Sequence, residues 1–472
     1  MINFKNVIIV KYEKGEKQMN FKERRYYKKN LNEVLHTTLN PYQPGVVRIH
    51  LVPAKYKPFK AEPSLVFLNG KDIIPLNLSW TILLSIFIKE VNNYKGNEIT
   101  DEELQKIVSE TVEKTLKIYK EAGRINLKND LGRMMSVFID VATGKKPEEK
   151  IGQLSIGEYA KDMQAPHRMD LMVSAMTKNG KWNCNQKCVH CYAAGQEYAE
   201  TKELTSEEWK KIIDKCRKFR IPQLTFTGGE PTKREDLVEL IDYAKWFVTR
   251  LNTNGALLTK ELCKKLYEAS LDSVQVTLYS YNEEEHNTLV GAKNFDKTVQ
   301  GIKNAISEGL ALSINTPLCS INKNYVETLK FAKELGIKYV SCSGLIVTGN
   351  ARTEKSIETQ LSEDELYNIL KEAKEYADKN LMEISFTSPG WISEEKLREL
   401  GLDVPTCGAC LSNMAIAPDG EVVPCQSWLG QDAGLGNILK TDWKKIWNNP
   451  RCKKRRAYSA KSTPNCPLRG GC

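Results

Sequence analysis

Between about residues 165 and 348 the sequence alternates short apolar stretches with segments whose apolar residues recur at helical spacing. The apolar stretches have the length of β-strands, and the segments between them have the length of helices. Near-continuous apolar strands that alternate with helices are typical of a parallel sheet covered by helices. The sequence therefore predicts an α/β fold. The expected strands are Met169–Ala175, Gln223–Thr227, Trp246–Asn252, Ser273–Leu278, Leu310–Thr316 and Tyr339–Ser343.

Amphipathic helices are expected between these strands. Ser206 is the expected N-cap of the first helix, because an apolar face follows it at helical spacing. The further helical segments lie near residues 234–244, 259–269, 296–308 and 324–335.

Three cysteines follow the first expected strand. Cys184, Cys188 and Cys191 stand in a C-x3-C-x2-C spacing. Three thiolates on a short loop can each bind one iron of a cubane cluster, and they leave the fourth iron open to a small molecule. The alternative is a structural zinc site, which needs a fourth Cys or His ligand. His190 lies inside the triplet, where it is poorly placed to complete such a site, so the spacing favours an iron–sulfur cluster.

Two further motifs lie at expected strand ends, T-G-G-E-P at Thr227–Pro231 and T-N-G at Thr253–Gly255. Together with the cysteine triplet they resemble the motifs of the radical S-adenosylmethionine (SAM) superfamily over about residues 165–355. The resemblance implies a partial (β/α)6 barrel, which six strand–helix units fit better than a closed barrel of eight. It implies a [4Fe–4S] cluster on the three cysteines, SAM on the open iron, and an electron donor such as ferredoxin or flavodoxin. SAM cleavage then yields a 5′-deoxyadenosyl radical that abstracts hydrogen from substrate.

The same resemblance implies a SAM pocket. The backbone of Gly228 and Gly229 and the carboxylate of Glu230 are expected to receive the amino group of SAM, since glycine lets a backbone approach a ligand. Thr277 matches a hydroxyl that many members of the family offer to SAM. An ordinary β-branched strand residue is the alternative for Thr277.

The sequence departs from the family where an arginine usually meets the SAM carboxylate. An H-D-x-x-R motif is replaced here by the sequence H-N-T-L-V from His286 to Val290. Lys293 and Arg352 are the candidate replacements, since either could offer a cation to a carboxylate. Tyr279 is a candidate radical relay, with a packed aromatic side chain as the simpler alternative.

Residues 401–472 carry a second group of cysteines. C-G-A-C at 407–410, followed by Gly420 and Cys425, resembles the C-x9-15-G-x4-C opening of a SPASM or twitch domain, with Asp419–Gly420 as a hairpin turn. Only Cys466-x5-Cys472 remains of the downstream SPASM pattern, which implies one auxiliary [4Fe–4S] cluster. The implied ligands are Cys407, Cys410, Cys425 and Cys466, with Cys472 as the substitute for the last. A four-cysteine zinc ribbon is the competing interpretation.

The other cysteines are expected to be inert and buried where they fall on the core faces of predicted helices or near strands. These are Cys216, Cys263, Cys319 and Cys342.

The N-terminal part has a different pattern. Leu65–Leu68 and Ile73–Leu76 flank Asn69–Gly70, a strong signal for a two-residue hairpin turn. Helices are expected around Ser79–Val91 and from about residue 101 to 121. This winged-helix-like pattern resembles the leader-recognition element of enzymes that mature ribosomally made peptides, which bind a leader as an added strand. A lid or structural cap is the alternative.

Composition limits the alternatives. The 472 residues are 41% hydrophobic and 27% charged, which is ordinary for globular proteins. The longest apolar run, Trp80–Ile88, is shorter than the ~20 residues of a membrane span, and the chain begins with only a short apolar patch. We expect a cytoplasmic protein without a signal peptide or membrane span. Thirteen cysteines then favour metal or redox use over disulfides.

The net charge of +10 is partly concentrated in the run from Arg451 to Arg456, for which we expect a solvated surface. Nucleic-acid-binding runs are usually interleaved with aromatic residues, and only Tyr458 is near, so nucleic acid is not an expected partner. Attraction of an acidic peptide is the other use of such charge.

The expected domains are a winged-helix-like domain (1–130), a linker (131–164), the radical SAM barrel (165–355), bridging helices (356–400) and an auxiliary-cluster domain (401–472). The leading hypothesis is a radical SAM enzyme that forms a thioether or carbon–carbon cross-link in a precursor peptide. The alternatives are a radical SAM enzyme that acts on a small metabolite, and a zinc-stabilised binding protein without catalysis.

Overall fold

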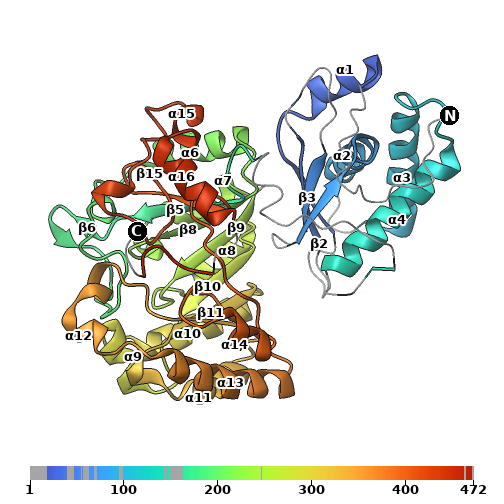
Figure 1. The fold of residues 1–472 in the computed structure, drawn as a ribbon. Coiled ribbons are helices and arrows are strands. Elements are labelled where there is room, and N and C mark those ends of the chain that lie inside the picture. Colours follow the sequence, from blue (N-terminus) through green and yellow to red (C-terminus); the bar gives the residue numbers. More distant parts are fainter. Residues whose placement is uncertain are drawn as a thin grey trace. The chain divides into compact units, whose positions relative to one another are not determined.

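The computed structural model describes residues 19–39, 47–54, 56, 63–68, 72–94, 99–142, 145, 147–148, 163–245, 247–461 and 464–469. The chain forms two compact units (Figure 1). One consists of residues 1–155 with 216–222, and the other of residues 156–215 with 223–472. None of the described helices combines the length and the apolar character that a membrane crossing requires.

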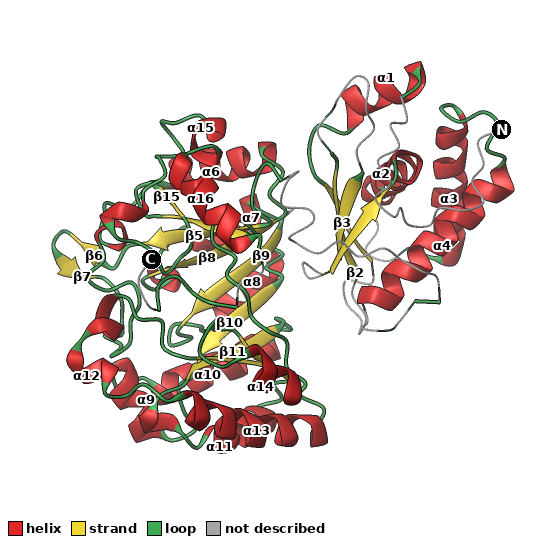
Figure 2. Ribbon diagram, in the orientation of Figure 1, coloured by secondary structure: helices red, strands yellow, loops and turns green. Residues whose placement is uncertain are grey.

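The first unit contains a four-stranded antiparallel sheet in the order β1-β2-β3-β4. Figure 2 shows strands β2 and β3 of this sheet with helices of the same unit beside them. The expected hairpin is confirmed as β3 and β4, which pair Ser64 with Leu76 and Leu68 with Asp72. Its expected turn at Asn69–Gly70 lies outside the described residues. The elements are α1 (Phe21–Asn30), β1 (Leu35–Leu39), β2 (Val47–Val52), β3 (Ser64–Leu68), β4 (Asp72–Leu76), α2 (Leu78–Asn93), α3 (Asp101–Leu116) and α4 (Arg124–Ala142).

Helix α2 forms the centre of this unit. It packs on β1, β2 and α3, and its side chains are buried nearly all round, from Trp80 to Val91. A helix that is apolar on all sides is stable only when it is covered on all sides. The Asn77 side chain caps α2 by accepting the N–H of Trp80 at 2.9 Å. The expected helices are therefore present, whereas β1, β2, α1 and α4 were not expected, and α4 continues into the range assigned to a linker.

The second unit contains a nine-stranded sheet in the order β13-β12-β11-β10-β9-β8-β5-β14-β15. Neighbouring strands are parallel from β13 to β14, and only β15 is antiparallel to its neighbour. The parallel α/β prediction is confirmed. The strands are β5 (Arg168–Ser174), β8 (Gln223–Gly228), β9 (Val248–Thr253), β10 (Ser273–Thr277), β11 (Leu312–Pro317), β12 (Tyr339–Ser343), β13 (Glu383–Phe386), β14 (Asn413–Ile416) and β15 (Val422–Val423).

Each strand from β8 to β13 is added at the same edge of this sheet, so the connecting helices cover one face, as in a partial barrel. Helix α6 is capped by Thr205, whose hydroxyl accepts the N–H of Glu208 at 3.3 Å; the expected cap, Ser206, is the first helical residue. The principal helices are α6 (Ser206–Lys218), α7 (Leu237–Tyr243), α8 (Lys260–Glu268), α9 (Glu283–Val290), α10 (Phe295–Ser307), α11 (Tyr325–Glu334), α12 (Glu354–Ile357), α13 (Glu363–Lys379), α14 (Glu394–Glu399), α15 (Trp443–Trp447) and α16 (Pro450–Ser459).

Two additions to this unit were not expected. A small hairpin, β6 (Thr177–Lys178) and β7 (Lys181–Trp182), separates β5 from the cysteine triplet. Its signal is Asn179–Gly180, where both residues have positive φ, as in the tight turns of two-residue hairpins. Strand β13 lies in the range assigned to bridging helices.

The C-terminal extension joins the sheet directly. Its β14–β15 hairpin, with the expected turn at Gly420 (φ +90°), pairs with β5 through β14. Met414, Ala415 and Ile416 of β14 are all completely buried. The extension therefore continues the core that contains the first strand of the barrel.

We predict that Ile416→Ala destabilises the second unit by about 3 kcal/mol, because it leaves a cavity at the β5–β14 junction. Ile357→Ala is the matched control, since Ile357 is 48% exposed and its truncation should cost less than about 0.5 kcal/mol. Thermal and denaturant unfolding of the full chain measure both. Equal effects of the two substitutions would show that β14 is not part of this core.

Candidate active site

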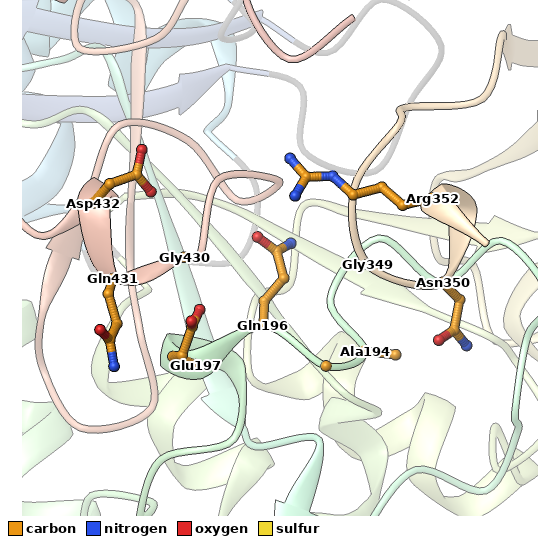
Figure 3. A pocket seen from close by; sticks show the side chains of 10 residues that line it. Ala194, Gln196, Glu197, Gly349, Asn350, Arg352, Gly430, Gln431 and Asp432 are labelled. Atoms are coloured by element: carbon orange, nitrogen blue, oxygen red, sulfur yellow. The ribbon is translucent and has the colours of Figure 1, made fainter. Parts of the chain in front are cut away.

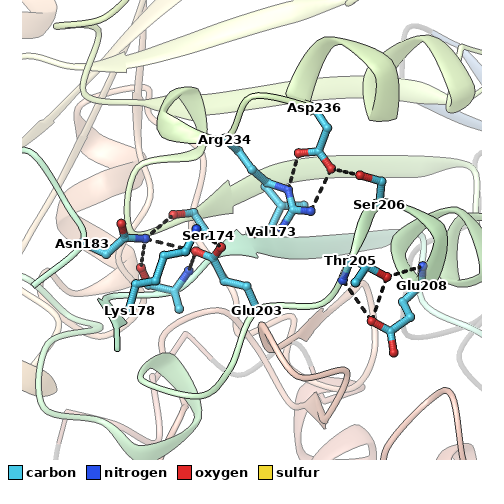
Figure 4. A network of polar contacts seen from close by, with 11 residues as sticks. Val173, Ser174, Lys178, Asn183, Glu203, Thr205, Ser206, Glu208, Arg234 and Asp236 are labelled. Atoms are coloured by element: carbon cyan, nitrogen blue, oxygen red, sulfur yellow. Dashed lines mark hydrogen bonds and ion pairs between the residues drawn. The ribbon is translucent and has the colours of Figure 1, made fainter. Parts of the chain in front are cut away.

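The loop that carries the cysteine triplet is attached to the carboxyl end of β5. The Asn183 side chain donates to the Ala175 carbonyl at 3.1 Å and to the Glu203 carboxylate at 3.0 Å (Figure 4). Glu203 also accepts the Ala175 N–H at 2.9 Å. These contacts place Cys184, the next residue, directly beyond the strand end, as the sequence predicted.

The Gly-Gly turn is held by the same strand end. The N–H of Gly229 donates to the Ser174 carbonyl at 2.8 Å. A Cβ atom at Gly228, where φ is +140°, would overlap the backbone of Ser174, and one at Gly229 would lie 2.9 Å from the Ala175 carbonyl oxygen. Packing of β8 on β5 therefore requires glycine at both positions, a reason separate from the expected approach to SAM.

Arg234, just beyond this turn, also binds β5. Its guanidinium donates to the Val173 carbonyl at 2.8 Å and is paired with Asp236 at 2.7 Å (Figure 4). Three consecutive carbonyls at the end of β5 are thus occupied by side chains or backbone from the site loops.

Glu230 connects two of the predicted motifs. Its carboxylate is buried and accepts hydrogen bonds from the Thr253 hydroxyl at 2.7 Å, the Asn254 N–H at 2.8 Å and the Thr232 N–H at 3.0 Å. Burial raises the pKa of Glu230, and the hydrogen bonds oppose that shift. The carboxylate joins T-G-G-E-P to T-N-G, while its predicted contact with SAM remains a prediction.

Asn254 extends this connection to the cysteine loop, because its side-chain amide donates to Asn185 Oδ1 at 2.7 Å. Asn185 follows Cys184 directly. The three motifs that the sequence placed at separate strand ends are therefore joined by hydrogen bonds.

A second segment holds the other side of the cysteine loop. The Asn350 side chain donates to the Cys188 carbonyl at 3.1 Å, and its backbone N–H donates to the Cys191 carbonyl at 2.9 Å. His190 Nε2 lies 2.7 Å from the Thr359 hydroxyl. Burial lowers the pKa of His190 to about 4, so its ring is neutral near pH 7. No local sequence pattern indicates this contact, because it depends on how α12 docks.

The three thiols suit an iron cluster. Burial raises the pKa of Cys184 to about 12, and burial together with Cys191 and Cys184 raises that of Cys188. Thiols in this environment form thiolates only if bound cations compensate the charge. Among the described residues, no three Cys, His, Asp or Glu side chains are arranged to hold a single metal ion. A cluster differs from a single ion because each thiolate binds its own iron.

The remaining predicted SAM contacts are placed as follows. Thr277 ends β10 and is half-buried, and Lys293 is exposed after α9. Tyr279 is buried in an apolar cluster that includes Cys188 and Cys319. Arg352 is exposed and donates to the Val347 carbonyl at 3.0 Å. Lys293 and Arg352 both stay predicted partners of the SAM carboxylate.

The C-terminal cysteines also come together. Burial, together with the neighbouring Cys407 and Cys466, raises the pKa of Cys425 to about 12. The Cys410 thiol neighbours that of Cys452, a residue outside the predicted ligand set. The predicted alternative ligand Cys472 lies outside the described residues. Cys216, Cys263, Cys319 and Cys342 are buried, as expected.

The basic run differs from its prediction in one respect. Arg451, Lys453 and Lys454 are exposed, but Arg455 and Arg456 stack on tryptophan rings, Arg455 at 4.1 Å from the Trp428 centroid and Arg456 at 3.8 Å from the Trp447 centroid. These two cations face the protein because helical spacing places them on the buried side of α16.

The two cysteine groups are near the same apolar surface. One buried cluster contains Met172 and Val423, and Cys191, Tyr192 and Trp428 pack against it. A cavity of about 470 Å³ lies beside it (Figure 3). The cavity wall combines the end of the cysteine loop, the segment before α12 and the segment after Cys425: Ala194, Gly195, Gln196, Glu197, Gly349, Asn350, Arg352, Gly430, Gln431 and Asp432.

Residues 183–323 match the radical SAM superfamily, and residues 407–472 match the SPASM iron–sulfur cluster-binding domain. Over 294 residues the chain is 30% identical to the AdoMet-dependent heme synthase of Methanosarcina barkeri. The match covers 56% of this chain and 79% of that protein. The chain belongs to the radical SAM superfamily. This radical SAM enzyme therefore uses a [4Fe–4S] cluster and SAM, with auxiliary iron–sulfur chemistry in its SPASM domain, and the zinc-stabilised binding protein is excluded.

Other similarities differ in extent. The Fe-coproporphyrin III synthase of Methanosarcina barkeri is 38% identical over 156 residues, but the match spans only 31% of this radical SAM enzyme and 38% of that protein. Streptococcus suis SuiB, in its structure bound to the precursor peptide SuiA, has a similar fold with a TM-score of 0.57 and 16% identity. That likeness covers 87% of this chain and 92% of SuiB.

We predict that Gly228→Ala destabilises the second unit by about 2 kcal/mol or more, because the new Cβ overlaps Ser174 and the backbone keeps a positive φ. Gly132→Ala is the control. Gly132 lies within α4 with open space around its Cα, so alanine there should be neutral or stabilise the chain by about 0.5–1 kcal/mol. Thermal unfolding of both variants decides, and a Gly228→Ala variant as stable as the wild type would contradict the packing argument.

Proposed function

We propose that this radical SAM enzyme modifies a ribosomally made precursor peptide, by forming a thioether or carbon–carbon cross-link. The observation that carries the proposal is the extent of the fold likeness to SuiB, which includes most of the chain and is not confined to the barrel. The described residues of the N-terminal unit have their own core, which runs from Met19 to Val141. In a peptide maturase, such a unit could bind the leader segment of the precursor peptide.

Cys184, Cys188 and Cys191 would hold the radical cluster, and Cys407, Cys410 and Cys425 would supply auxiliary thiolates. SAM bound at the first cluster supplies hydrogen-atom abstraction through a 5′-deoxyadenosyl radical. The chain itself positions the loops: β5 fixes the loop that begins at Cys184, and Asn350 fixes its far end. Cys184 and Cys191 pack against a buried apolar cluster, which would limit the access of water to the first cluster.

Leader binding would use a sheet edge of the first unit. An added strand needs backbone N–H and C=O groups that point outward. Strand β4 contains Pro75, which has no N–H to offer. We therefore assign the leader to the β1 edge, at Leu35–Leu39.

A small low-potential electron carrier such as ferredoxin or flavodoxin would deliver the electron for SAM cleavage.

The second candidate is a radical SAM enzyme that acts on a small metabolite. The heme synthase of Methanosarcina barkeri favours it, since its 30% identity extends over 79% of that protein. In that case the N-terminal unit would serve as a cap. Peptides that co-purify with the enzyme from its native host would separate the two candidates.

We predict that Cys184→Ala, Cys188→Ala and Cys191→Ala each abolish SAM cleavage, because two remaining thiolates cannot retain the cubane. Cys263→Ala, which removes a buried helical thiol elsewhere, is the control and should keep full cleavage. Chromatographic measurement of 5′-deoxyadenosine after reduction gives the readout. Wild-type production in any of the three variants would refute the assignment of the cluster.

We predict that proline substitution in β1 weakens peptide binding. Adjacent residues of a strand direct their N–H groups to opposite edges of the strand. One of the variants Thr37→Pro and Thr38→Pro therefore loses a hydrogen bond to β2, and the other loses an N–H donor that points outward. The variant with the outward loss should keep its thermal midpoint and its uncoupled SAM cleavage. Its affinity for the co-purified peptide, measured by fluorescence anisotropy, should fall at least about tenfold, as expected for the loss of a hydrogen bond and the steric effect of proline. Unchanged affinity in both variants would contradict binding at β1.

A further inference from the structure

One face of helix α16 points at the auxiliary cysteines. Cys452, Arg456 and Ser459 are spaced i, i+4 and i+7 along the helix, so they share one face. Cys452 and Ser459 are buried, and Arg456 is half-buried. The hydroxyl of Ser459 donates to the Ala409 carbonyl at 2.8 Å and lies 3.7 Å from the Cys407 sulfur. The helix is therefore docked directly on the C-G-A-C segment.

The thiol of Cys452 neighbours the thiol of Cys410 on this face. Cys466 also neighbours Cys407 and Cys425, but it is half-buried in the chain's last described segment, whereas Cys452 is completely buried. No disulfide links the described cysteines. A helix side chain fixed by packing is a more exact ligand position than one on a loop.

Arg456 adds a donor to the Cys452 sulfur. Its guanidinium donates to Cys452 Sγ at 3.4 Å and to the Trp447 carbonyl at 3.0 Å, while it stacks on the Trp447 ring. Among the ion pairs of the described residues, none joins Arg456 to a carboxylate. Arg456 is half-buried and faces the Cys452 sulfur, which is the arrangement expected if Cys452 is a thiolate. Hydrogen bonds from a cation to a ligand sulfur stabilise a cluster.

We propose that Cys452 is the fourth protein ligand of the auxiliary cluster, together with Cys407, Cys410 and Cys425, and that Arg456 sets the reduction potential of that cluster. This inference rests on the proposed function, in which residues 407–472 hold an auxiliary cluster. It replaces Cys466 and Cys472, the two terminal candidates that the sequence pattern suggested. Metal binding then docks α16 as well as the hairpin, since the ligands come from both.

The test uses the full chain with Cys184, Cys188 and Cys191 all changed to Ala, so that only the auxiliary site remains. After anaerobic reconstitution this parent should hold about four iron and four sulfide per chain. Adding Cys452→Ala should remove most of this iron and the low-temperature EPR signal of the reduced cluster. Adding Cys466→Ala and Cys472→Ala together should leave both unchanged.

The reverse pattern, with iron lost on removal of Cys466 and Cys472 but kept without Cys452, would overturn the inference and leave the proposed function intact. A parent without iron would instead remove the auxiliary cluster itself, and the inference with it. Near-ultraviolet circular dichroism and thermal unfolding check that each variant folds. Cys263→Ala in the same parent is the matched control for loss of a buried helical thiol.

Arg456 offers a second readout that a packing role would not move. Arg456→Gln in the same parent should keep the iron but lower the reduction potential of the cluster, because a cation next to a ligand thiolate stabilises the more negative reduced state. Arg456→Lys should restore part of the shift. Arg398→Gln is the control, since Arg398 is exposed and pairs with Glu394. An unchanged potential in Arg456→Gln would contradict the placement of Cys452 at the cluster.

Discussion

The backbone of Val173, Ser174 and Ala175 at the end of β5 receives hydrogen bonds from three separate parts of the candidate site. One comes from Arg234, one from Gly229 and one from Asn183, the residue before the cysteine triplet. The other edge of β5 pairs with β14 of the C-terminal extension. The triplet loop follows the carboxyl end of β5, whereas Cys407, Cys410 and Cys425 lie near the amino end of β14. Strand β5 is therefore the common support of both cysteine groups, the triplet at its carboxyl end and the extension along its side.

This arrangement gives a physical reason for the two glycines of T-G-G-E-P. The sequence suggested that they allow a close approach to SAM, and the structure adds that β8 cannot lie against β5 if either carries a Cβ. The two reasons are compatible, because the Gly228–Gly229 turn can pack on β5 with one side and present its backbone to SAM with the other. Glu230 then bonds the turn to Thr253 and Asn254, so the SAM motifs form a connected, buried network.

Much of the second unit was predictable from sequence, since its central strands are continuous apolar runs and its helices have one apolar face. The triplet and the Gly-Gly turn were predictable because their residue types and spacing carry the chemistry. Contacts that depend on how distant segments of the chain dock on one another were not predictable from the sequence. The hold of Asn350 on the cysteine loop and the contact of Cys452 with Cys410 join residues distant in sequence, and neither has a local pattern. The β6–β7 hairpin did have one, in Asn179–Gly180.

We expect one chain to hold two iron–sulfur clusters, one open to SAM and one on the C-terminal extension. The most direct measurement is iron and acid-labile sulfide per chain in the anaerobically reconstituted wild type, combined with Mössbauer and EPR spectra with and without SAM. Two cubane clusters should give about eight iron and eight sulfide per chain, and a SAM-dependent change in about half of the iron signal. Zinc in place of iron, or about four iron that all respond to SAM, would contradict it.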